Sequence, residues 1–499
     1  MIEFKNVSFS YNVDGNANGG GCLKNIDLKI NRGEAIVLAG ESGCGKTTIT
    51  RLINGLIPYY YEGMLTGDII IDGKNSKDMS LYEISKNTGS VFQNPRSQFF
   101  NVDTDSELAF SCENQGMPVE EIKRRIKETV ELFGVQRLMH RSIFDMSGGE
   151  KQIMACAAVS VADPDIIVLD EPSSNLDMKA TAELKKCIRI WKSQKKTIII
   201  AEHRLRYLSD IADRVLYIRD GRIENSFTFD ELREKSFNEL KTLGLRPVTD
   251  DQFIKPESIV SENRKKFTLR DFSFAYKRSA PALKIEECSV PFGEITAVIG
   301  NNGAGKTTFS RCLCGLVKKC KGVAEYDDNK LKRRDRLKKS FMVMQDVNNQ
   351  LFTESVQDEV AISCDDEDNE RVTEILRSLD LEELSDRHPA SLSGGHKQRC
   401  AIACAIASNK EIMIFDEPTS GLDLRHMFEV ADNIRYVKSD DRCILVISHD
   451  LELILSCCTY VVRLEKGEVI EHYHLDSEGI GRLVDFFEEP FRTSSSDVL

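Results

Sequence analysis

Two segments of the sequence have the composition of a phosphate-binding loop. They read GESGCGKTT (40–48) and GNNGAGKTT (300–308). Glycines let the backbone curl so that its N–H groups point at phosphate oxygens at a helix N-terminus. In this pattern the lysine reaches the outer phosphates and the first threonine binds Mg²⁺. The predicted loop residues are Gly40, Ser42, Gly43, Gly45, Lys46, Thr47 and Thr48, and Gly300, Asn302, Gly303, Gly305, Lys306, Thr307 and Thr308.

Two acidic pairs and two histidines add groups that could cleave a terminal phosphate. Each aspartate ends an apolar run, the position from which a carboxylate can hold Mg²⁺. The glutamate that follows could orient and polarise the attacking water, and the histidine at the end of the next run could contact the γ-phosphate. One acidic pair or one histidine is more often structural, but the repetition favours catalysis. The residues are Asp170, Glu171 and His203, and then Asp416, Glu417 and His449.

Apolar runs rich in β-branched residues come directly before each of these motifs. They read AIVLAG, DIIVLD and TIIIAEH in the first half, and ITAVIG, EIMIFD and CILVISH in the second. Continuous apolar runs of this length are typical of strands buried on both faces, and therefore of a parallel sheet covered by helices. The sequence thus predicts an α/β fold with two tandem P-loop NTPase domains.

The motifs occur twice in the same order, which indicates duplication of one domain. Their spacing is constant from Ser147 and Ser393 to His203 and His449, whereas the first half of copy two is shorter. A helical pattern and a polar stretch with two prolines separate the copies. We place domain one at 1–245, a linker at 246–264, domain two at 265–485 and a flexible tail at 486–499.

The composition is that of an ordinary globular protein of 499 residues, with 41% hydrophobic and 29% charged residues and a net charge of -13. This acidic balance argues against a nucleic-acid partner. The 15 cysteines show no framework spacing, so we expect reduced thiols in a cytosolic protein. No run approaches the roughly 18 apolar residues of a membrane span. Any membrane role would therefore come through partners.

The segments SGGEKQ (147–152) and SGGHKQ (393–398) are similar to the signature of the ABC-type ATPase family. The resemblance covers nearly the whole chain twice and implies a helical subdomain in each copy. It also implies that ATP with Mg²⁺ lies head to tail between the two domains. The signature of one copy would then complete the ATP site of the other: Ser147, Gly148 and Gly149 that of Lys306, and Ser393, Gly394 and Gly395 that of Lys46.

The resemblance also assigns two tyrosines, and it is not perfect. Tyr11 and Tyr276 match the aromatic residue that stacks on adenine in this family, although core tyrosines of a strand are the alternative. Met146 replaces the signature leucine, and Glu150 and His396 stand where glutamine is usual. The predicted phosphate-binding residues and both glutamates are all present. We therefore expect both sites to hydrolyse ATP, at rates that can differ.

A loop with two glutamines occurs in each copy, as VFQNPRSQFF (91–100) and VMQDVNNQLF (343–352). In ABC ATPases the first glutamine, here Gln93 and Gln345, links the Mg²⁺ site to a groove that receives a helix of a membrane partner. The second, Gln98 and Gln350, resembles the ATPases of energy-coupling factor transporters. That resemblance implies a peripheral protein at the cytoplasmic side of the membrane, bound to a transmembrane coupling protein and a substrate-binding membrane subunit.

Three functions compete at this stage. The preferred one is the ATPase of an importer for vitamins or transition-metal ions. A tandem sugar-importer ATPase is disfavoured because such proteins usually carry one degenerate site. A soluble ribosome-associated ABC ATPase is disfavoured because the junction between the copies is short and mixed in charge.

Overall fold

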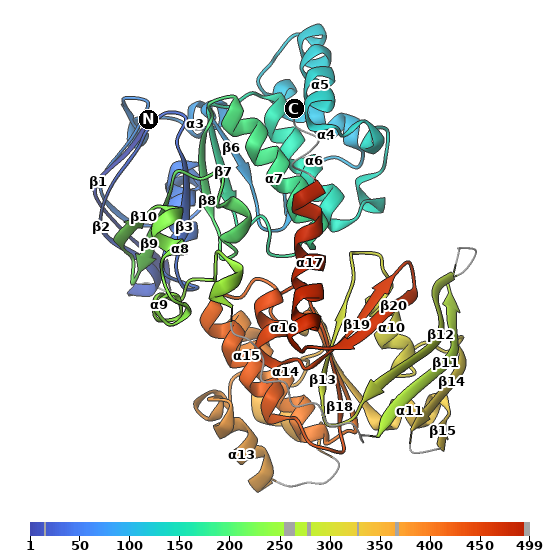
Figure 1. Cartoon of the computed structure of the whole chain (residues 1–499). Helices are drawn as coiled ribbons and strands as arrows, with labels where there is room; N and C mark the ends of the chain where they lie inside the picture. The colour runs from blue at the N-terminus through green and yellow to red at the C-terminus, as the bar shows by residue number, and fades with distance from the viewer. Residues whose placement is uncertain (14–15, 254–264, 277–280, 327–328, 365–368, 494–499) are drawn as a thin grey trace. The chain divides into compact units, whose positions relative to one another are not determined.

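The computed structural model describes residues 1–13, 16–253, 265–276, 281–326, 329–364 and 369–493. The chain divides into two compact units, the first built mainly from Met1–Gln252 and the second mainly from Phe253–Leu422 and His426–Glu489 (Figure 1). Each unit contains one four-stranded and one six-stranded sheet.

The first unit places its phosphate-loop strand near the middle of the larger sheet. The antiparallel sheet has the order β2-β1-β4-β5, from β1 (Ile2–Val13), β2 (Asn16–Ile30), β4 (Gly63–Ile71) and β5 (Lys74–Asn75). The larger sheet has the order β10-β9-β3-β8-β7-β6 and is parallel except at β10. Its strands are β3 (Ala35–Ala39), β6 (Thr88–Val91), β7 (Ile166–Asp170), β8 (Thr197–Ala201), β9 (Arg214–Arg219) and β10 (Arg222–Phe227).

Helices α4, α5 and α7 of this unit pack against α6, the helix that the signature segment opens. The helices are α1 (Lys46–Ile53), α2 (Leu56–Tyr59), α3 (Leu81–Asn87), α4 (Thr104–Asn114), α5 (Val119–Phe133), α6 (Gly148–Val161), α7 (Met178–Ser193), α8 (Phe229–Arg233) and α9 (Phe237–Leu243).

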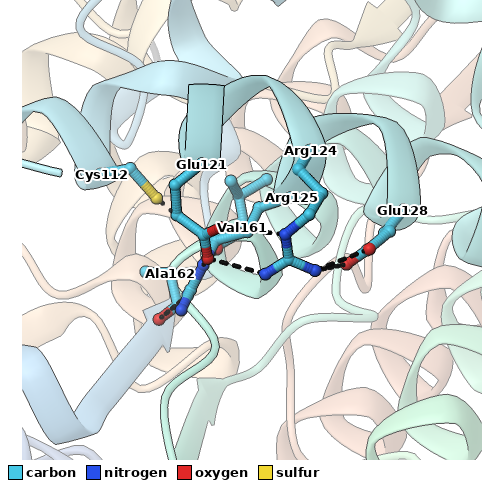
Figure 2. A network of polar contacts seen from close by, with 7 residues as sticks. All are labelled: Cys112, Glu121, Arg124, Arg125, Glu128, Val161 and Ala162. Carbon is cyan, nitrogen blue, oxygen red and sulfur yellow. Dashed lines mark hydrogen bonds and ion pairs between the residues drawn. The ribbon is translucent and has the colours of Figure 1, made fainter. Parts of the chain in front are cut away.

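A polar network joins α5 to the end of α6 (Figure 2). Arg125 donates from Nη1 to the carbonyl oxygens of Val161, at 3.4 Å, and Ala162, at 3.3 Å. Glu121 accepts from Nε of Arg125 at 2.8 Å and also pairs with Arg124. Hydrogen bonds from these two arginines lower the pKa of the Glu121 carboxyl to about 2. An arginine thus satisfies carbonyl groups that the end of α6 leaves without helical partners.

The second unit repeats this plan. Its antiparallel sheet has the order β12-β11-β14-β15, from β11 (Lys266–Ala275), β12 (Pro281–Pro291), β14 (Lys321–Tyr326) and β15 (Asn329–Leu331). The larger sheet has the order β16-β17-β18-β13-β19-β20. The larger sheet of the first unit, read from β6 to β10, has its equivalent strands in the same order. Its strands are β13 (Ile295–Ile299), β16 (Ser340–Val343), β17 (Ile412–Asp416), β18 (Cys443–Ile447), β19 (Tyr460–Glu465) and β20 (Glu468–His474).

The helices of the second unit follow the same sequence of roles. They are α10 (Lys306–Leu313), α11 (Arg333–Lys339), α12 (Val356–Ala361), α13 (Asn369–Ser378), α14 (Gly394–Ser408), α15 (Leu424–Tyr436), α16 (Leu451–Cys457) and α17 (Ser477–Thr493). Helix α14 corresponds to α6, and α10 to α1.

The central strands are buried on both faces, as their apolar runs predict. In β3, Val37 belongs to one hydrophobic core, which includes residues of α4, α5, α6 and α7. Its neighbours Ile36 and Leu38 belong to another, which includes residues of β1, β2 and α1. Alternation of side chains along a strand sends successive residues to opposite faces, so a strand between two cores must be apolar throughout. The predicted fold of two α/β P-loop domains is confirmed.

The domain ends differ in part from the predicted ones. Residues 246–252, predicted as linker, pack on the first unit: Val248 is buried, and Gln252 donates to the carbonyl oxygens of Leu232 and Lys235, both at 2.8 Å. The predicted tail is helical up to Thr493, and Phe487 within it is buried. This part of the helix was not predicted because the sequence ends in polar residues, although the apolar residues of the helix recur at helical spacing. Residues 254–264 and 494–499 lie outside the described residues.

Candidate active sites

The loop between β3 and α1 has the backbone of a phosphate cradle. Gly40, Gly43 and Gly45 have φ values of 148, 78 and 112°, conformations that side chains disfavour. A Cβ on Gly40 would lie 2.1 Å from the carbonyl oxygen of Ile218, whereas a Cβ on Gly43 would meet nothing within 4 Å. Gly45 begins α1 with no side-chain cap. Open space over glycine, beside uncapped N–H groups, fits a phosphate group.

Lys46, Thr47 and Asp170 lie together at the start of α1 and the end of β7. Nζ of Lys46 donates to the carbonyl oxygens of Gly40, at 2.8 Å, and Glu41, at 3.0 Å. Oγ1 of Thr47 donates to Oδ1 of Asp170 at 3.0 Å. Burial, followed by the negative charge of the neighbouring Glu171, raises the pKa of Asp170 to about 6. A bound Mg²⁺ would relieve this cost by stabilising the ionised carboxylate, so the pair suits a divalent cation.

Glu171 follows in a strained backbone conformation, with a φ of 43°. Its N–H donates to the carbonyl oxygen of Ala201 at 2.8 Å, which fixes the turn to the end of β8. Its carboxylate accepts from Nε2 of Gln93 at 2.8 Å and lies 3.3 Å from Nε2 of His203. Burial raises the pKa of Glu171, but His203 and Lys46 outweigh it, and the net pKa is lowered. An ionised carboxylate at this point can accept a proton from water.

His203 is 8% exposed, and its Nε2, 3.3 Å from the Glu171 carboxylate, has no hydrogen-bond partner of suitable geometry among the described residues. A buried polar atom without a partner is costly and fits a site that a ligand completes. The loop after β8 is fixed by Glu202, which is 1% exposed. Glu202 accepts from the N–H of His203 at 2.8 Å, from the N–H of Ser173 at 3.3 Å and from the hydroxyl of Tyr207 at 3.0 Å. Nothing in the sequence singles out this glutamate beyond its place beside the histidine.

The second unit places the corresponding residues in a related but different network. Nζ of Lys306 donates to the carbonyl oxygens of Gly300, at 2.7 Å, and Asn301, at 3.2 Å. It also lies 2.9 Å from Nε2 of His449. Thr307 hydrogen-bonds to Asp416, and burial raises the pKa of Asp416. The loop glycines again have φ values in the left-handed region: Gly300 149°, Gly303 81° and Gly305 101°.

Glu417 has the same strained backbone as Glu171, with a φ of 50°. Its N–H donates to the carbonyl oxygen of Ile447 at 2.9 Å. Its carboxylate accepts from the N–H of His449 at 3.2 Å and lies 3.2 Å from Nε2 of the same histidine. The buried carboxylate that fixes the following loop is here Asp450, which accepts from Oγ1 of Thr419 at 3.0 Å.

The glutamine loops do not place their first glutamines alike. Gln93 is bonded to Glu171, whereas Gln345 is exposed and makes no hydrogen bond to Glu417 among the described residues. The second glutamines face their own loops: Oε1 of Gln98 accepts from the N–H of Phe92, and Oε1 of Gln350 from the N–H of Met344, both at 3.1 Å. These side chains therefore hold the loop backbone in shape.

Tyr11 and Tyr276 occupy equivalent places and differ in exposure. The hydroxyl of Tyr11 lies 3.3 Å from Oγ1 of Thr48, and its ring is half-buried in edge-to-face contact with Phe9. The hydroxyl of Tyr276 lies 3.2 Å from Oγ1 of Thr308, and the residue is 51% exposed. Each tyrosine is thus hydrogen-bonded to its own phosphate loop, a position compatible with stacking on a base.

The signature serines begin their helices and are tied to the residue three positions on. Ser147 caps α6: its Oγ accepts from the N–H of Glu150 at 3.3 Å, while the Glu150 carboxylate accepts from the Ser147 N–H at 2.8 Å. In α14, Oγ of Ser393 lies 2.9 Å from Nδ1 of His396. The departures from glutamine at 150 and 396 therefore provide helix caps of different charge. A Cβ on Gly149 would lie 2.7 Å from Cβ of Ala180, so only glycine allows this approach to α7.

Comparison with known proteins agrees with this geometry. The chain matches the ABC transporter family over residues 23–174 and 283–420 and belongs to that family. A protein of Treponema denticola described as a putative ABC transporter ATP-binding protein is 45% identical over 478 residues, 94% of this chain and 96% of the relative. One of the same description from Methanosarcina mazei is 30% identical over 526 residues, 94% and 88% of the two chains.

Among solved structures, an RNase-L inhibitor superposes with a TM-score of 0.65 at 20% identity, covering 97% of this chain and 93% of that one. This likeness shows the tandem fold. The chain is therefore a fused tandem ABC ATPase that binds and hydrolyses ATP, and ABC ATPases generally use ATP with Mg²⁺. No helix within the described part of the chain has both the length and the apolar character needed to cross a membrane.

Proposed function

We propose that this protein is the ATPase subunit of a membrane importer, with each unit receiving a helix of a transmembrane protein. The observation that carries the proposal is a surface pocket of about 410 Å³ in the second unit. Gln350 and Phe352 of the glutamine loop line it, together with Ile362 and residues of α14. Phe352 and Ile362 are 73% and 63% exposed, an uncommon degree for apolar side chains flanking a pocket.

The first unit carries the same kind of surface at the same place in the sequence. Phe100, two residues after the second glutamine as Phe352 is, is 76% exposed. Its ring stacks on that of Phe110 of α4, with centroids 4.9 Å apart. Apolar side chains of a short amphipathic helix would fit such a surface. Two such surfaces in one chain suit a transmembrane partner that offers two helices.

Contacts within the first unit lead from this surface to the glutamate. The N–H of Phe100 donates to the buried carboxylate of Glu107 at 3.1 Å, which fixes the end of the glutamine loop to α4. At the other end of the loop, Gln93 binds Glu171 at 2.8 Å. Movement of a helix seated against Phe100 would therefore shift the loop that holds the proposed catalytic base.

The same proposal covers the composition of the ATP sites. We assign Glu171 and Glu417 as catalytic bases, His203 and His449 as γ-phosphate contacts, and Asp170 and Asp416 with the adjoining threonines as Mg²⁺ ligands. Mg²⁺ would neutralise charge on the β- and γ-phosphates. The signature serines Ser147 and Ser393 would complete the ATP site of the opposite unit. ATP binding would close the units on each other, and hydrolysis would release them.

The curated relatives support the transporter assignment through their descriptions as putative ABC transporter ATP-binding proteins. Within importers, the second glutamine favours the energy-coupling factor group. The alternative is a ribosome-associated ATPase, because a structure described as ribosome-bound archaeal Pelota and ABCE1 shares the fold with a TM-score of 0.66. At 21% identity that likeness concerns the fold, and so we keep the importer as our proposal.

The test is affinity purification of the tagged protein from detergent-solubilised membranes, comparing wild type with Phe100→Asp/Phe352→Asp. Leu132→Asp is the matched control, because Leu132 is an exposed apolar residue of α5 away from the glutamine loop. We expect a polytopic membrane protein to co-purify with wild type and with the control but not with the double variant. Recovery of ribosomal proteins with an empty membrane fraction would overturn the transport assignment and leave the ATPase chemistry intact.

A further inference from the structure

The segment between α10 and β16 of the second unit is strongly basic. Residues 316–339 contain ten basic and four acidic side chains, although the whole chain has a net charge of -13. The corresponding segment of the first unit, residues 56–87 between α1 and β6, contains three basic and five acidic side chains. Six exposed cations of the second unit form what we call the basic surface: Lys318, Lys319, Lys321, Lys332, Arg334 and Lys338.

Backbone contacts hold the loop after α10 against α11, so that the cations of both belong to one surface (Figure 1). Arg333 of α11 donates from Nη1 to the carbonyl oxygen of Gly315 at 3.0 Å. A Cβ on Gly315 would lie 2.5 Å from the carbonyl oxygen of Arg333, which shows how closely the loop packs on the helix. Helix α11 also contacts β15, and β15 is paired with β14. The loop, β14 and α11 are therefore neighbours.

The cations of the basic surface have no ion pair with a carboxylate within the described residues. Two carboxylates of the same segment are engaged elsewhere. Glu325 pairs with Arg270 at 2.8 Å, and Asp335 accepts from the backbone N–H of Lys332 at 3.0 Å. In α5 of the first unit, by contrast, the arginines are paired with glutamates of their own helix. Unpaired like charges repel one another, and bound anions would remove this repulsion.

Two exposed leucines lie among these cations. Leu316, in the loop after α10, is 48% exposed, and Leu337 of α11 is 36% exposed. No aromatic side chain is exposed in the described residues 316–326 and 329–339. The ring of Tyr326 stacks on that of Phe292, with centroids 4.4 Å apart. Cations interleaved with apolar side chains fit the boundary between headgroups and acyl chains of a bilayer. A surface for single-stranded nucleic acid would instead offer aromatic rings to the bases.

The basic surface also adjoins the pocket that we assign to the membrane partner. Helix α11 leads directly into β16, and Phe341 of β16 lines that pocket. A partner helix seated in the pocket would hold this part of the second unit near the bilayer. We propose that the basic surface binds anionic lipid headgroups beside the transporter, an inference that rests on the proposed function. Clusters of about four to eight Lys and Arg at a membrane surface have this property.

The experiment measures co-sedimentation of the full-length protein with vesicles that contain no protein. The vesicles consist of phosphatidylcholine, either alone or mixed with the anionic lipid phosphatidylglycerol. We expect binding only where phosphatidylglycerol is present. Raising the salt from about 0.1 M to about 1 M shortens the screening length from about 10 Å to about 3 Å and should remove most of this binding. If the protein does not sediment with the anionic vesicles at low salt, the proposal is wrong.

The variant Lys319→Gln/Arg334→Gln/Lys338→Gln removes three charges from the basic surface. Each charge near an anionic membrane strengthens binding about fivefold, so the apparent affinity for the vesicles should fall about a hundredfold. The variant should keep wild-type ATP hydrolysis, because none of these side chains belongs to the ATP site. Undiminished binding of this variant to the vesicles would overturn the proposal.

The matched control is Lys24→Gln/Lys74→Gln/Lys127→Gln, which changes the net charge of the chain by the same amount. These three lysines are exposed and lie on separate elements of the first unit. The control should bind the anionic vesicles as wild type does. An equal loss of binding in the control would show that net charge decides, and the assignment to the basic surface would then be wrong.

Two further measurements separate lipid from other anions and from the proposed function. Leu316→Ser/Leu337→Ser should lower binding to the anionic vesicles several-fold, because the leucines would enter the bilayer boundary. Unchanged binding of this variant, or tighter binding of wild type to single-stranded RNA than to the vesicles, would overturn the membrane assignment. If wild type binds the vesicles but captures no membrane protein in the affinity purification, only the proposed function fails.

Discussion

The two candidate active sites share a backbone and differ in the side chains around the glutamate. Glu171 and Glu417 both adopt a positive φ after a buried aspartate, and each donates its N–H to the end of the neighbouring strand. In the first unit Gln93 donates to the carboxylate, and Nε2 of His203 lies 3.3 Å from it without a hydrogen bond of suitable geometry among the described residues. In the second, Nε2 of His449 lies 2.9 Å from Nζ of Lys306. The strained turn therefore occurs in both units, whereas the side-chain contacts around it differ between them.

A second difference between the two units concerns the buried carboxylate beside the histidine. The loop after the histidine strand is fixed by Glu202, just before His203, in the first unit and by Asp450, just after His449, in the second. Both carboxylates are at most 2% exposed. A buried carboxylate that accepts several hydrogen bonds is strongly held. The loop thus needs a buried acceptor, and either side of the histidine can supply it.

Removal of both glutamate charges should produce the largest effect. In Glu171→Gln/Glu417→Gln the proposed bases are lost, and steady-state ATP hydrolysis should fall about 100-fold or more. ATP should remain bound, so a closed form should accumulate and be visible as a compaction by small-angle scattering. The single variants then show which of the two sites contributes more to ATP hydrolysis. Full turnover in the double variant would refute the assigned role of both residues.

The lysines should give the next largest effect and an unequal one. Lys46→Ala or Lys306→Ala would remove the proposed charge-assisted bonds to phosphate, and ATP affinity at that site should fall about tenfold to a hundredfold. Lys306→Ala also removes one of the contacts of His449, so it should impair hydrolysis more than Lys46→Ala. Binding is measured by calorimetry, with the exposed Lys86→Ala as a control. Unchanged affinity in either variant would count against its phosphate loop.

The first glutamines should separate the sites more finely. Gln93→Ala removes the hydrogen bond to Glu171 and should change the rate of the first site about threefold to tenfold. Gln345→Ala should change the rate of the second site less than about twofold, because Gln345 is exposed and, within the described residues, makes no hydrogen bond to Glu417. Single-turnover hydrolysis is measured in backgrounds where the other site carries its Glu→Gln substitution. Equal effects would show that ATP binding makes the two loops alike.

The sequence was sufficient for features that depend on strand burial and motif order. The apolar runs before Asp170 and Asp416 correspond to β7 and β17, because only strands between two cores need be apolar on both faces. The phosphate loops could be predicted because their glycines mark positions where the backbone needs positive φ values. The repeated motifs also predicted that the two halves are copies of one domain, and the strand order, which is the same in both units, agrees with this.

Other features could not be predicted, because they depend on the direction of a side chain. The pattern predicts that Gln98 and Gln350 meet a partner, and it gave no sign that Oε1 of each accepts a hydrogen bond from the backbone of its own loop. Glu202 and Asp450 occupy different sequence positions in the two copies, so the repeat conceals their shared role.

The smallest expected effect concerns the scaffold, where the two units should behave alike. Arg125 donates to the carbonyl oxygens at the end of α6, and Arg371 donates to that of Ile406 at 3.5 Å, near the end of α14. Arg125→Met and Arg371→Met should each lower the free energy of unfolding of its unit by about 1 kcal/mol. Urea titration followed by domain-specific hydrogen exchange measures both. A markedly larger loss for Arg125→Met would show that its pairing with Glu121 (Figure 2) adds stability, and the copies would then differ in scaffold as well as in chemistry.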